Sequence, residues 1–158
     1  MKILVTGGAG YIGSHTVKAL CENGHTPVVL DNLSRGHKPS IPAGVEFLEK
    51  DIADPDLAKV MKDLGIEGIM HFAAHSQVGE SMQKPNIYYE NNVVGSYRLI
   101  ESARLAGVKN FVFSSTAAVY GEPDVVPITE DSPHRPTNVY GRTKLMIEQM
   151  LSDYSNIY

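Results

Sequence analysis

The stretch Ile3-Leu4-Val5-Thr6-Gly7-Gly8-Ala9-Gly10-Tyr11-Ile12-Gly13 decides the fold of this chain. Its first three residues form a short apolar run that is typical of a buried parallel strand. Gly7 then permits a tight turn, Gly10 lets the backbone approach a pyrophosphate, and Gly13 lets a helix pack closely on the strand. A helix that begins near Tyr11 directs N–H groups and its positive dipole end at phosphates. We predict a dinucleotide-binding turn, with an ordinary glycine-rich turn as the alternative.

Strand-like and helix-like segments alternate along the rest of the chain. Short apolar runs predict further strands at residues 28–30, 45–48, 69–73 and 111–113. Apolar spacing and stop signals predict helices at residues 12–23, 54–64, 85–106 and 139–154, and loops at residues 32–44 and 122–136. Such alternation is typical of βαβ units. We therefore predict an α/β fold with a doubly wound parallel sheet of the Rossmann type.

Length and composition indicate one globular domain. The chain has 158 residues, of which 42% are hydrophobic and 20% charged, enough to bury a core. It stops after the last predicted helix, where the alternation would next require a strand. We therefore expect residues 1–158 to be one Rossmann-like domain that is incomplete at its C-terminal end.

Charge and cysteine content restrict the partners and the compartment. The net charge is -4 and Lys and Arg form no cluster, so neither nucleic acid nor an anionic membrane is an expected partner. No apolar run approaches the ~20 residues that span a bilayer, and the start of the chain shows no signal-peptide pattern. Cys21 is the only cysteine, and its apolar helical surroundings predict a buried, inert thiol. We expect a cytoplasmic protein.

An acidic residue ends the second predicted strand. Asp31 lies 18 residues after Gly13, close to the spacing of ~20 at which a carboxylate binds the adenosine ribose hydroxyls. Its charge would repel a 2′-phosphate, which favours NAD over NADP, whereas the nearby Arg35 would suit that phosphate. Asp51 and Ile52 follow the third strand, where they either frame an adenine or, through Asp51, cap the next helix.

A tyrosine and a lysine share one face of the last predicted helix. Tyr140 and Lys144 are four residues apart. A phenol has a pKa near 10 and is a poor base at neutral pH, but a neighbouring ammonium or a positively charged nicotinamide would lower that pKa. The pair is therefore a candidate for proton transfer, with an incidental surface pair as the alternative.

Hydroxyl and imidazole groups follow two other strands. Ser114, Ser115 and Thr116 come at the carboxyl edge of the sheet, where ligands bind, although Ser114 and Ser115 would also serve to satisfy the strand-end backbone. His71 and His75 are the only close histidine pair, and no matching carboxylate spacing accompanies them. We expect no metal site.

Seven strings together resemble the extended short-chain dehydrogenase/reductase family, and most closely its UDP-glucose 4-epimerases. They are TGGAGYIG (6–13), LDNLSRG (30–36), KDI (50–52), HFAAHSQVGESMQKP (71–85), YYENNVVGS (88–96), FSSTAAVYGEP (113–123) and NVYGRTK (138–144). The resemblance covers essentially the whole chain. Its most specific parts are the VGES and YYENNV strings.

The resemblance implies roles for individual residues. Tyr140 is the base, Lys144 its partner, and Thr116 takes the position of the family's hydroxyl. The residues that correspond to NAD-contacting segments are Gly7, Gly10, Tyr11, Ile12, Gly13, Asp31, Asn32, Ser34, Arg35, Gly36, Asp51, Ile52, Phe72, Ala73, Ala74, Ser76, Asn91, Ser114, Tyr140 and Lys144. Ser76 departs from the pattern, because some relatives carry a lysine there. Ala117 and Ala118 replace the Asp-Glu pair with which related 4,6-dehydratases eliminate water.

The resemblance also implies an activity. It indicates NAD-dependent epimerisation of a UDP-sugar at carbon 4 through a 4-keto sugar, by a protein that forms a homodimer at full length. A decarboxylase or reductase of a related sugar nucleotide stays an alternative, as does an NAD-binding fragment or regulatory module without turnover. The substrate domain that the family carries after this region is absent from the 158 residues.

Overall fold

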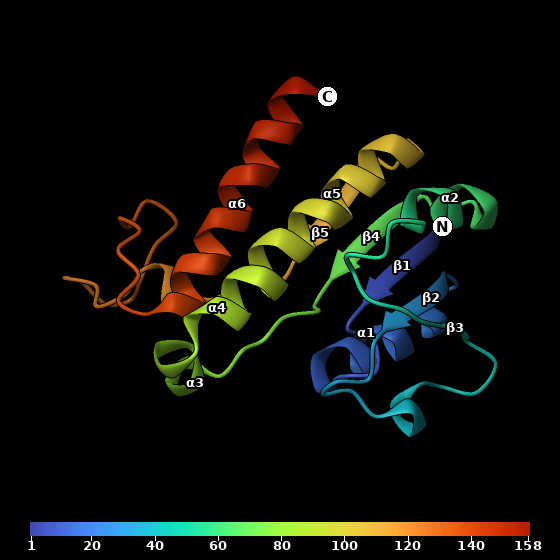
Figure 1. Ribbon diagram of the computed structural model, residues 1–158, viewed down its shortest axis with the longest axis horizontal. Coiled ribbons are helices and arrows are strands. Elements are labelled where there is room, and N and C mark those ends of the chain that lie inside the picture. Colours follow the sequence, from blue (N-terminus) through green and yellow to red (C-terminus); the bar gives the residue numbers. More distant parts are fainter. The chain divides into compact units, whose positions relative to one another are not determined.

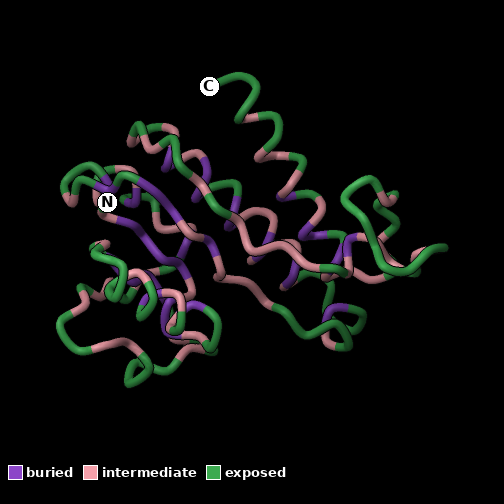
Figure 2. The backbone as a smooth tube through the Cα atoms, turned by 180° about the vertical axis from the view of Figure 1, so that it is seen from behind, coloured by how far each residue is buried: buried purple, intermediate pink, exposed green.

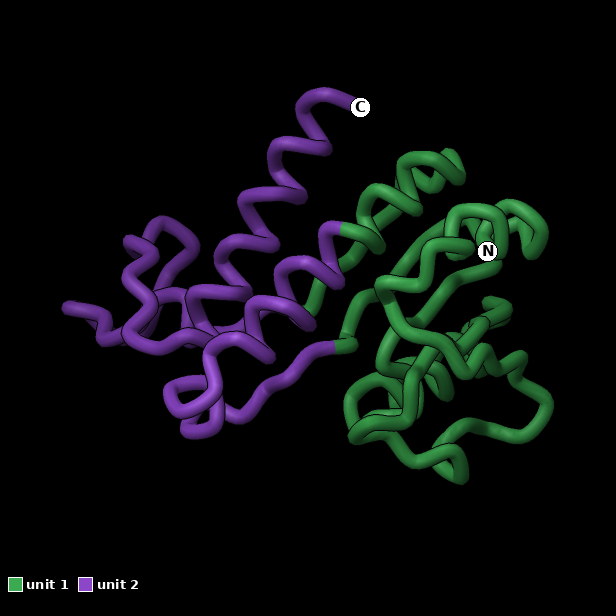
Figure 3. Tube along the Cα trace, in the orientation of Figure 1, with its two compact units in different colours: residues 1–73, 98–114 green, residues 74–97, 115–158 purple.

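The computed structural model describes all residues, 1–158, in two compact units. Unit 1 comprises Met1–Ala73 and Arg98–Ser114, and unit 2 comprises Ala74–Tyr97 and Ser115–Tyr158 (Figure 3). None of the helices combines the length and the apolar character that a membrane span requires.

Unit 1 is built on a five-stranded parallel sheet (Figure 1). The strands are β1 (Lys2–Thr6), β2 (Thr26–Asp31), β3 (Glu46–Glu49), β4 (Gly68–His71) and β5 (Asn110–Phe113). Their spatial order is β3-β2-β1-β4-β5, and every neighbouring pair is parallel. The order reverses at β1, and ligands of such sheets bind beyond the carboxyl ends of the strands at this reversal. The predicted doubly wound parallel sheet is confirmed.

Helices cover both faces of this sheet because its central strands are apolar on both sides. On one face, Leu4, Val28 and Ile69 pack with residues of α2 (Leu57–Leu64) and α5 (Gly95–Ala106). On the other face, Ile3, Val5 and Val29 pack with Val17 of α1 (Tyr11–Glu22). In Figure 2 the strand that begins at the N-terminus is therefore coloured as buried along most of its length.

Several predicted boundaries in unit 1 were wrong by a few residues. The helix expected from residue 54 begins at Leu57, because residues 54–56 form a turn in which the carboxylate of Asp54 accepts a hydrogen bond from the Asp56 N–H (2.9 Å). The strand expected to reach residue 73 ends at His71, the last residue that pairs with β5. The loop at residues 32–44 contains one 3-10 turn, η1 (Lys38–Ser40).

The thiol of Cys21 is exposed, so the prediction that it is buried was wrong. The buried residues of α1 are Gly13 and Val17, and none lies in its last turn. Cys21 lies in the last turn and is followed by three exposed residues, so nothing in the local sequence covers it.

Unit 2 is helical. It contains α3 (Val78–Gln83), α4 (Pro85–Tyr88), the π-helix η2 (Tyr89–Val94), the first residues of α5, the 3-10 turn η3 (Ala117–Val119) and α6 (Val139–Ile157). Helix α6 packs against α3, α4, η2 and η3. The helix predicted at residues 85–106 is confirmed as three consecutive helical segments, α4, η2 and α5. Its middle segment, η2, is a π-helix, which is wider than an α-helix and is frequently found at functional sites.

Two features of unit 2 were not predicted. Helix α3 has only six residues, one of them Gly79, too few to show a helical period. Helix α6 continues to Ile157, three residues past its predicted end at residue 154. The predicted loop at residues 122–136 contains no helix or strand, which confirms it.

Candidate functional site

The glycine turn of unit 1 leaves no room for a side chain at two of its glycines. Gly7 has a φ of 71°, and a Cβ atom on it would lie 2.7 Å from the backbone nitrogen of Ala73. A Cβ atom on Gly13 would overlap the carbonyl oxygen of Gly7. Gly10 donates its N–H to that same oxygen (3.0 Å). The turn after β1 is therefore folded back tightly on its own backbone, as the sequence predicted.

The first turn of α1 is suited to bind an anion. Gly10 is its N-cap and offers no side-chain oxygen, and the first turn carries no acidic residue. The helix N–H groups at that end therefore meet no carboxylate of their own turn, and the helix dipole adds a positive potential. Tyr11 and Ile12 flank this end with 83% and 59% of their side chains exposed. Large exposed apolar side chains beside helix N–H groups are the expected lining of a nucleotide site.

Asp31 lies beside the glycine turn at the end of β2. Its carboxylate is buried and accepts hydrogen bonds from the N–H groups of Ala9 (3.0 Å) and Leu33 (2.8 Å). Leu33 adopts a φ of 57°, which is uncommon outside glycine and is favoured here by that hydrogen bond. A Cβ atom on Gly36 would lie 2.8 Å from the Asp31 carboxylate. The structure thus brings Asp31 and Gly36 together with the glycine turn.

The other predicted residues after β2 and β3 differ in exposure. Ser34 and Arg35 are exposed, and Asn32 donates a hydrogen bond to the carboxylate of Asp51 (2.8 Å). Asp51 does not cap α2, because the N-cap of that helix is Asp56. Ile52 is buried in the hydrophobic core of unit 1.

Residues at the ends of β4 and β5 complete the site of unit 1. Phe72 and Ala73 are half-buried, and the Ala73 backbone contacts the glycine turn as described above. The N–H of Ser114 donates to the carbonyl of His71 (3.1 Å). The His71 ring is buried, with Nδ1 2.6 Å from the Thr6 hydroxyl, so this histidine has a structural partner on β1.

In unit 2, a close approach of two segments sets the position of Tyr140. Asn138 caps α6 by accepting the N–H of Gly141 (2.8 Å). A Cβ atom on Gly141 would lie 2.6 Å from the carbonyl oxygen of Ala118 in η3, so only glycine allows α6 to start there. Helix α6 therefore begins directly against the segment that carries Thr116.

Thr116, Tyr140 and Lys144 come together in unit 2, as predicted. The Thr116 oxygen accepts the N–H of Ala118 (3.2 Å), and the Thr116 side chain lowers the pKa of the Tyr140 phenol against the larger effect of burial. Lys144 Nζ lies 6.0 Å from the centre of the Tyr140 ring. The Lys144 side chain is 3% exposed, so a cationic group is held inside unit 2 near the phenol.

The expected fall in the pKa of Tyr140 is not found. Burial raises the pKa of the Tyr140 phenol above its ordinary value, and the hydrogen bond from Thr116 lowers it by less. Burial also lowers the pKa of Lys144 to about 8, an effect that the charge of Glu148 opposes. Burial thus disfavours the charged form of Lys144. The ammonium is also not close enough to the phenol to reverse the rise that burial causes in the pKa of Tyr140.

A polar network beneath Tyr140 was not predicted from the sequence. The buried Asn92 on η2 accepts the N–H of His75 (2.9 Å) and donates to the His75 carbonyl (3.0 Å) and to Thr143 (3.2 Å). Thr143 in turn donates to the carbonyl of Tyr140 (2.8 Å). The buried Ser81 hydroxyl on α3 accepts the Tyr140 N–H (3.2 Å). The YENNV and VGES strings contain Asn92 and Ser81, so the signal was present without a role attached.

The remaining predicted residues of unit 2 surround this network. Asn91 donates to the side chain of Asn92 (2.9 Å), Ala74 is half-buried, and Ser76 is exposed. His75 is held through its backbone by Asn92.

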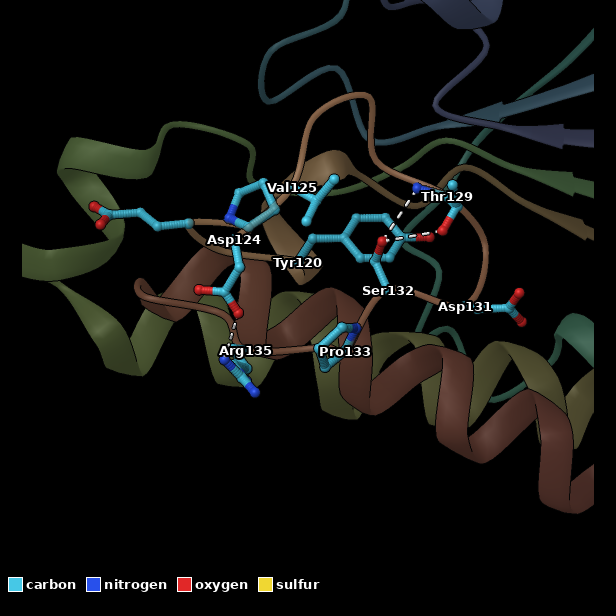
Figure 4. Close-up of a pocket in the computed structure, with 10 residues that line it drawn as sticks. Tyr120, Asp124, Val125, Thr129, Asp131, Ser132, Pro133 and Arg135 are labelled. Carbon is cyan, nitrogen blue, oxygen red and sulfur yellow. Dashed lines mark hydrogen bonds and ion pairs between the residues drawn. The ribbon is translucent and has the colours of Figure 1, made fainter.

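A pocket of about 360 Å³ opens in the loop of unit 2 between Tyr120 and Arg135 (Figure 4). Figure 4 shows Arg135 paired with Asp124 (3.3 Å), and both side chains are largely exposed. The Tyr120 ring forms one wall beside Thr129 and Ser132. None of the predicted site residues lines this pocket.

The chain belongs to the NAD dependent epimerase/dehydratase family, whose model matches residues 3–158. It is 52% identical over 155 residues to the UDP-glucose 4-epimerase of Corynebacterium glutamicum, covering 98% of this chain and 47% of that relative. The chain therefore spans about half the length of the curated relatives it matches.

Two solved structures show the same fold. The UDP-glucose 4-epimerase from Brucella ovis in complex with NAD has a TM-score of 0.96 and 46% identity, with 99% of this chain and 48% of that chain covered. The UDP-glucose 4-epimerase from Thermotoga maritima with UDP-glucose has a TM-score of 0.95 and 37% identity, with coverage of 100% and 52%.

Proposed function

We propose that residues 1–158 are the NAD-binding domain of an enzyme that epimerises UDP-sugars at carbon 4. Family membership, the resemblance of the site strings and the similarity to UDP-glucose 4-epimerases over nearly the whole chain support this proposal. The Brucella ovis relative was solved with NAD and the Thermotoga maritima relative with UDP-glucose. The homodimer and the cytoplasmic location stay predictions of the sequence.

The residues of unit 1 fit NAD. The tight glycine turn and the uncapped first turn of α1 offer backbone N–H groups to a pyrophosphate. The Asp31 carboxylate is fixed by two backbone donors, and its remaining lone pairs can accept the ribose hydroxyls. Bound there, NAD would supply hydride transfer from and back to carbon 4 of the sugar.

The residues of unit 2 carry out the proton transfer. Tyr140 takes the proton of the sugar 4-hydroxyl, so that the O–H bond breaks as the carbon becomes a ketone, and gives it back when the alcohol is restored. Thr116 donates a hydrogen bond to the Tyr140 oxygen and so favours its deprotonated form. Lys144 adds positive charge, and the cationic nicotinamide would add more. Both charges are needed because burial alone raises the pKa of Tyr140.

The observation that carries the proposal is the grouping of Thr116, Tyr140 and Lys144 in one unit, with the buried Lys144 ammonium 6.0 Å from the centre of the Tyr140 ring. A surface helix with an incidental tyrosine and lysine would not bury the lysine. Here Lys144 is 3% exposed. An enclosed cation close to a half-buried phenol is a typical arrangement for proton transfer.

The proposal is tested by turnover after residues 1–158 are joined to the remaining half of the Corynebacterium glutamicum relative, because the chain spans about half of that protein. The fusion protein is incubated with NAD and UDP-galactose, and UDP-glucose is measured by chromatography. Tyr140→Phe is expected to lower the rate by about a thousandfold, which is the usual contribution of general acid–base catalysis. Tyr120→Phe, in the loop pocket, is the matched control and is expected to keep the rate. A Tyr140→Phe variant that turns over like the original chain would overturn the role of Tyr140.

A further inference from the structure

Glu148 and Ser115 form a hydrogen-bonded pair that the reaction described above does not use. The Ser115 hydroxyl donates to a carboxylate oxygen of Glu148 in a short hydrogen bond. Both side chains are half-buried. Ser115 directly precedes Thr116, so one end of this pair is covalently attached to the segment that holds the Tyr140 phenol.

Glu148 also lies one helical turn after Lys144 on α6. Residues four apart share a helix face, so the carboxylate and the ammonium are neighbours. Lys144 is 3% exposed, and a buried ammonium loses most of its hydration. A carboxylate on the same face offsets part of this loss by favouring the charged form. The charge of Glu148 accordingly raises the pKa of Lys144 against the effect of burial.

The other titratable groups on the elements packed against α6 do not replace Glu148. On α3, Glu80 accepts a hydrogen bond from the Tyr88 hydroxyl of α4 (3.0 Å). On η2, Glu90 is exposed. The turn η3 has no titratable side chain. On α6 itself, Tyr140 offers a phenol, which is neutral near pH 7 because burial raises its pKa.

We propose that Glu148 is a positioning residue that keeps Lys144 protonated near neutral pH, and that Ser115 fixes Glu148 for this task. The link runs from Ser115 to Glu148 to Lys144, and so connects the Thr116 segment with the cation beside the phenol. The importance of the link for catalysis rests on the proposed function, in which Lys144 supports Tyr140. The existence of the link does not depend on the proposed function.

The experiment is an NMR titration of the 158-residue chain labelled with carbon-13 at the lysine ε positions, with Lys144→Met to assign the resonance. The original chain is expected to show Lys144 titrating near 8. Glu148→Gln is expected to lower this pKa by about one unit, and Ser115→Ala to lower it by less, because the carboxylate stays but loses its fixed orientation.

Asp153→Asn is the matched control. It removes one carboxylate from the same helix at an exposed position and is expected to leave the Lys144 pKa unchanged. An unchanged pKa in both Glu148→Gln and Ser115→Ala would overturn the proposal, as would an equal fall in Asp153→Asn. Should Glu148→Gln fail to fold, judged by circular dichroism, Ser115→Ala decides alone.

The titration uses neither substrate nor cofactor, so its result is independent of turnover. Full activity of Tyr140→Phe would refute the proposed function and leave the Ser115–Glu148–Lys144 link untouched. Turnover that rises, in a fusion protein carrying the substrate domain of a relative, through the pH range in which Lys144 loses its proton would refute the catalytic use of the link, because the cation is then not required.

Discussion

The two units position their site residues by different physical means. In unit 1, steric contacts determine the shape of the glycine turn and of the surroundings of Asp31. Gly7, Gly13 and Gly36 lie where a Cβ atom would collide with the backbone or with the Asp31 carboxylate. In unit 2, the close contact of Gly141 with Ala118 sets the start of α6, and buried hydrogen-bonding side chains then hold the backbone around it. Asn92 and Ser81 bind the backbone around Tyr140 and His75. A site shaped by steric contacts should lose its structure abruptly when atoms are added. A site held by hydrogen bonds should lose stability gradually as hydrogen-bond partners are removed.

The largest expected effect is that of Gly13→Ala. The added Cβ atom would overlap the Gly7 carbonyl, so the turn must open, and we expect unit 1 to lose about 3 kcal/mol or more and the chain to lose NAD binding. Chemical denaturation and calorimetric titration measure the two effects. Gly79→Ala on α3 is the control, because nothing lies within 4 Å of its Cβ position, and it should retain or slightly raise stability. A Gly13→Ala chain that keeps the original stability and NAD binding would contradict the steric interpretation.

Asn92→Ala comes next. It leaves the N–H and the carbonyl of His75 without their partner inside unit 2, and each buried unpaired group costs about 1–3 kcal/mol. We expect a loss of about 2–4 kcal/mol in the free energy of unfolding. Asn110→Ala removes an amide that donates to the Glu67 carbonyl at an exposed position and should cost less than about 1 kcal/mol. Equal losses for the two variants would show that burial of the network does not matter.

Lys144→Met is expected to stabilise the chain while it impairs proton transfer. Burial holds the pKa of Lys144 at about 8, against an ordinary value of 10.5, so the unfolded chain binds more protons between these values. The original chain therefore gains stability as the pH rises from 8 to 10.5, and below pH 8 the cost of the buried charge is fully present. Methionine should add about 1–3 kcal/mol at pH 7. Urea denaturation at several pH values should show that the stability gained by Lys144→Met shrinks towards pH 10.5. A stability gain that grows with pH would contradict this explanation.

The smallest expected effect is on the choice of cofactor. Asp31→Asn removes the charge that repels a 2′-phosphate but leaves a side-chain oxygen for one of the two backbone donors, Ala9 or Leu33. We expect the preference for NAD over NADP to fall by about tenfold, which corresponds to roughly 1.4 kcal/mol. Binding isotherms for the two cofactors measure it. Asp63→Asn on α2 is a control of equal charge and should leave the preference unchanged.

The sequence alone predicted the parts of the molecule that depend on local pattern. Buried apolar strands and the glycine spacing gave the sheet, its parallel topology and the close approach at Gly7 and Gly13. The helix pattern at residues 139–154 brought Tyr140 and Lys144 to one face. These features follow from steric and periodic rules that act over a few residues.

The parts that depend on tertiary contacts could not be predicted in the same way. Spacing placed Lys144 beside Tyr140, but it did not show that burial would raise the phenol pKa. Asn92 and Glu148 are ordinary polar residues in the sequence, and their roles arise only when η2 and the Ser115 segment pack against α6. Cys21 shows the reverse error, since an apolar neighbourhood in the sequence did not cover it in space.

Calorimetric titration of the 158-residue chain with NAD, beside NADP, tests most directly whether the glycine turn and Asp31 form a cofactor site. We predict one site per chain, with NAD bound at least about tenfold more tightly than NADP, and loss of that site in Gly13→Ala but not in Gly79→Ala. A folded chain that binds neither cofactor, or that binds NADP more tightly, would contradict the assignment.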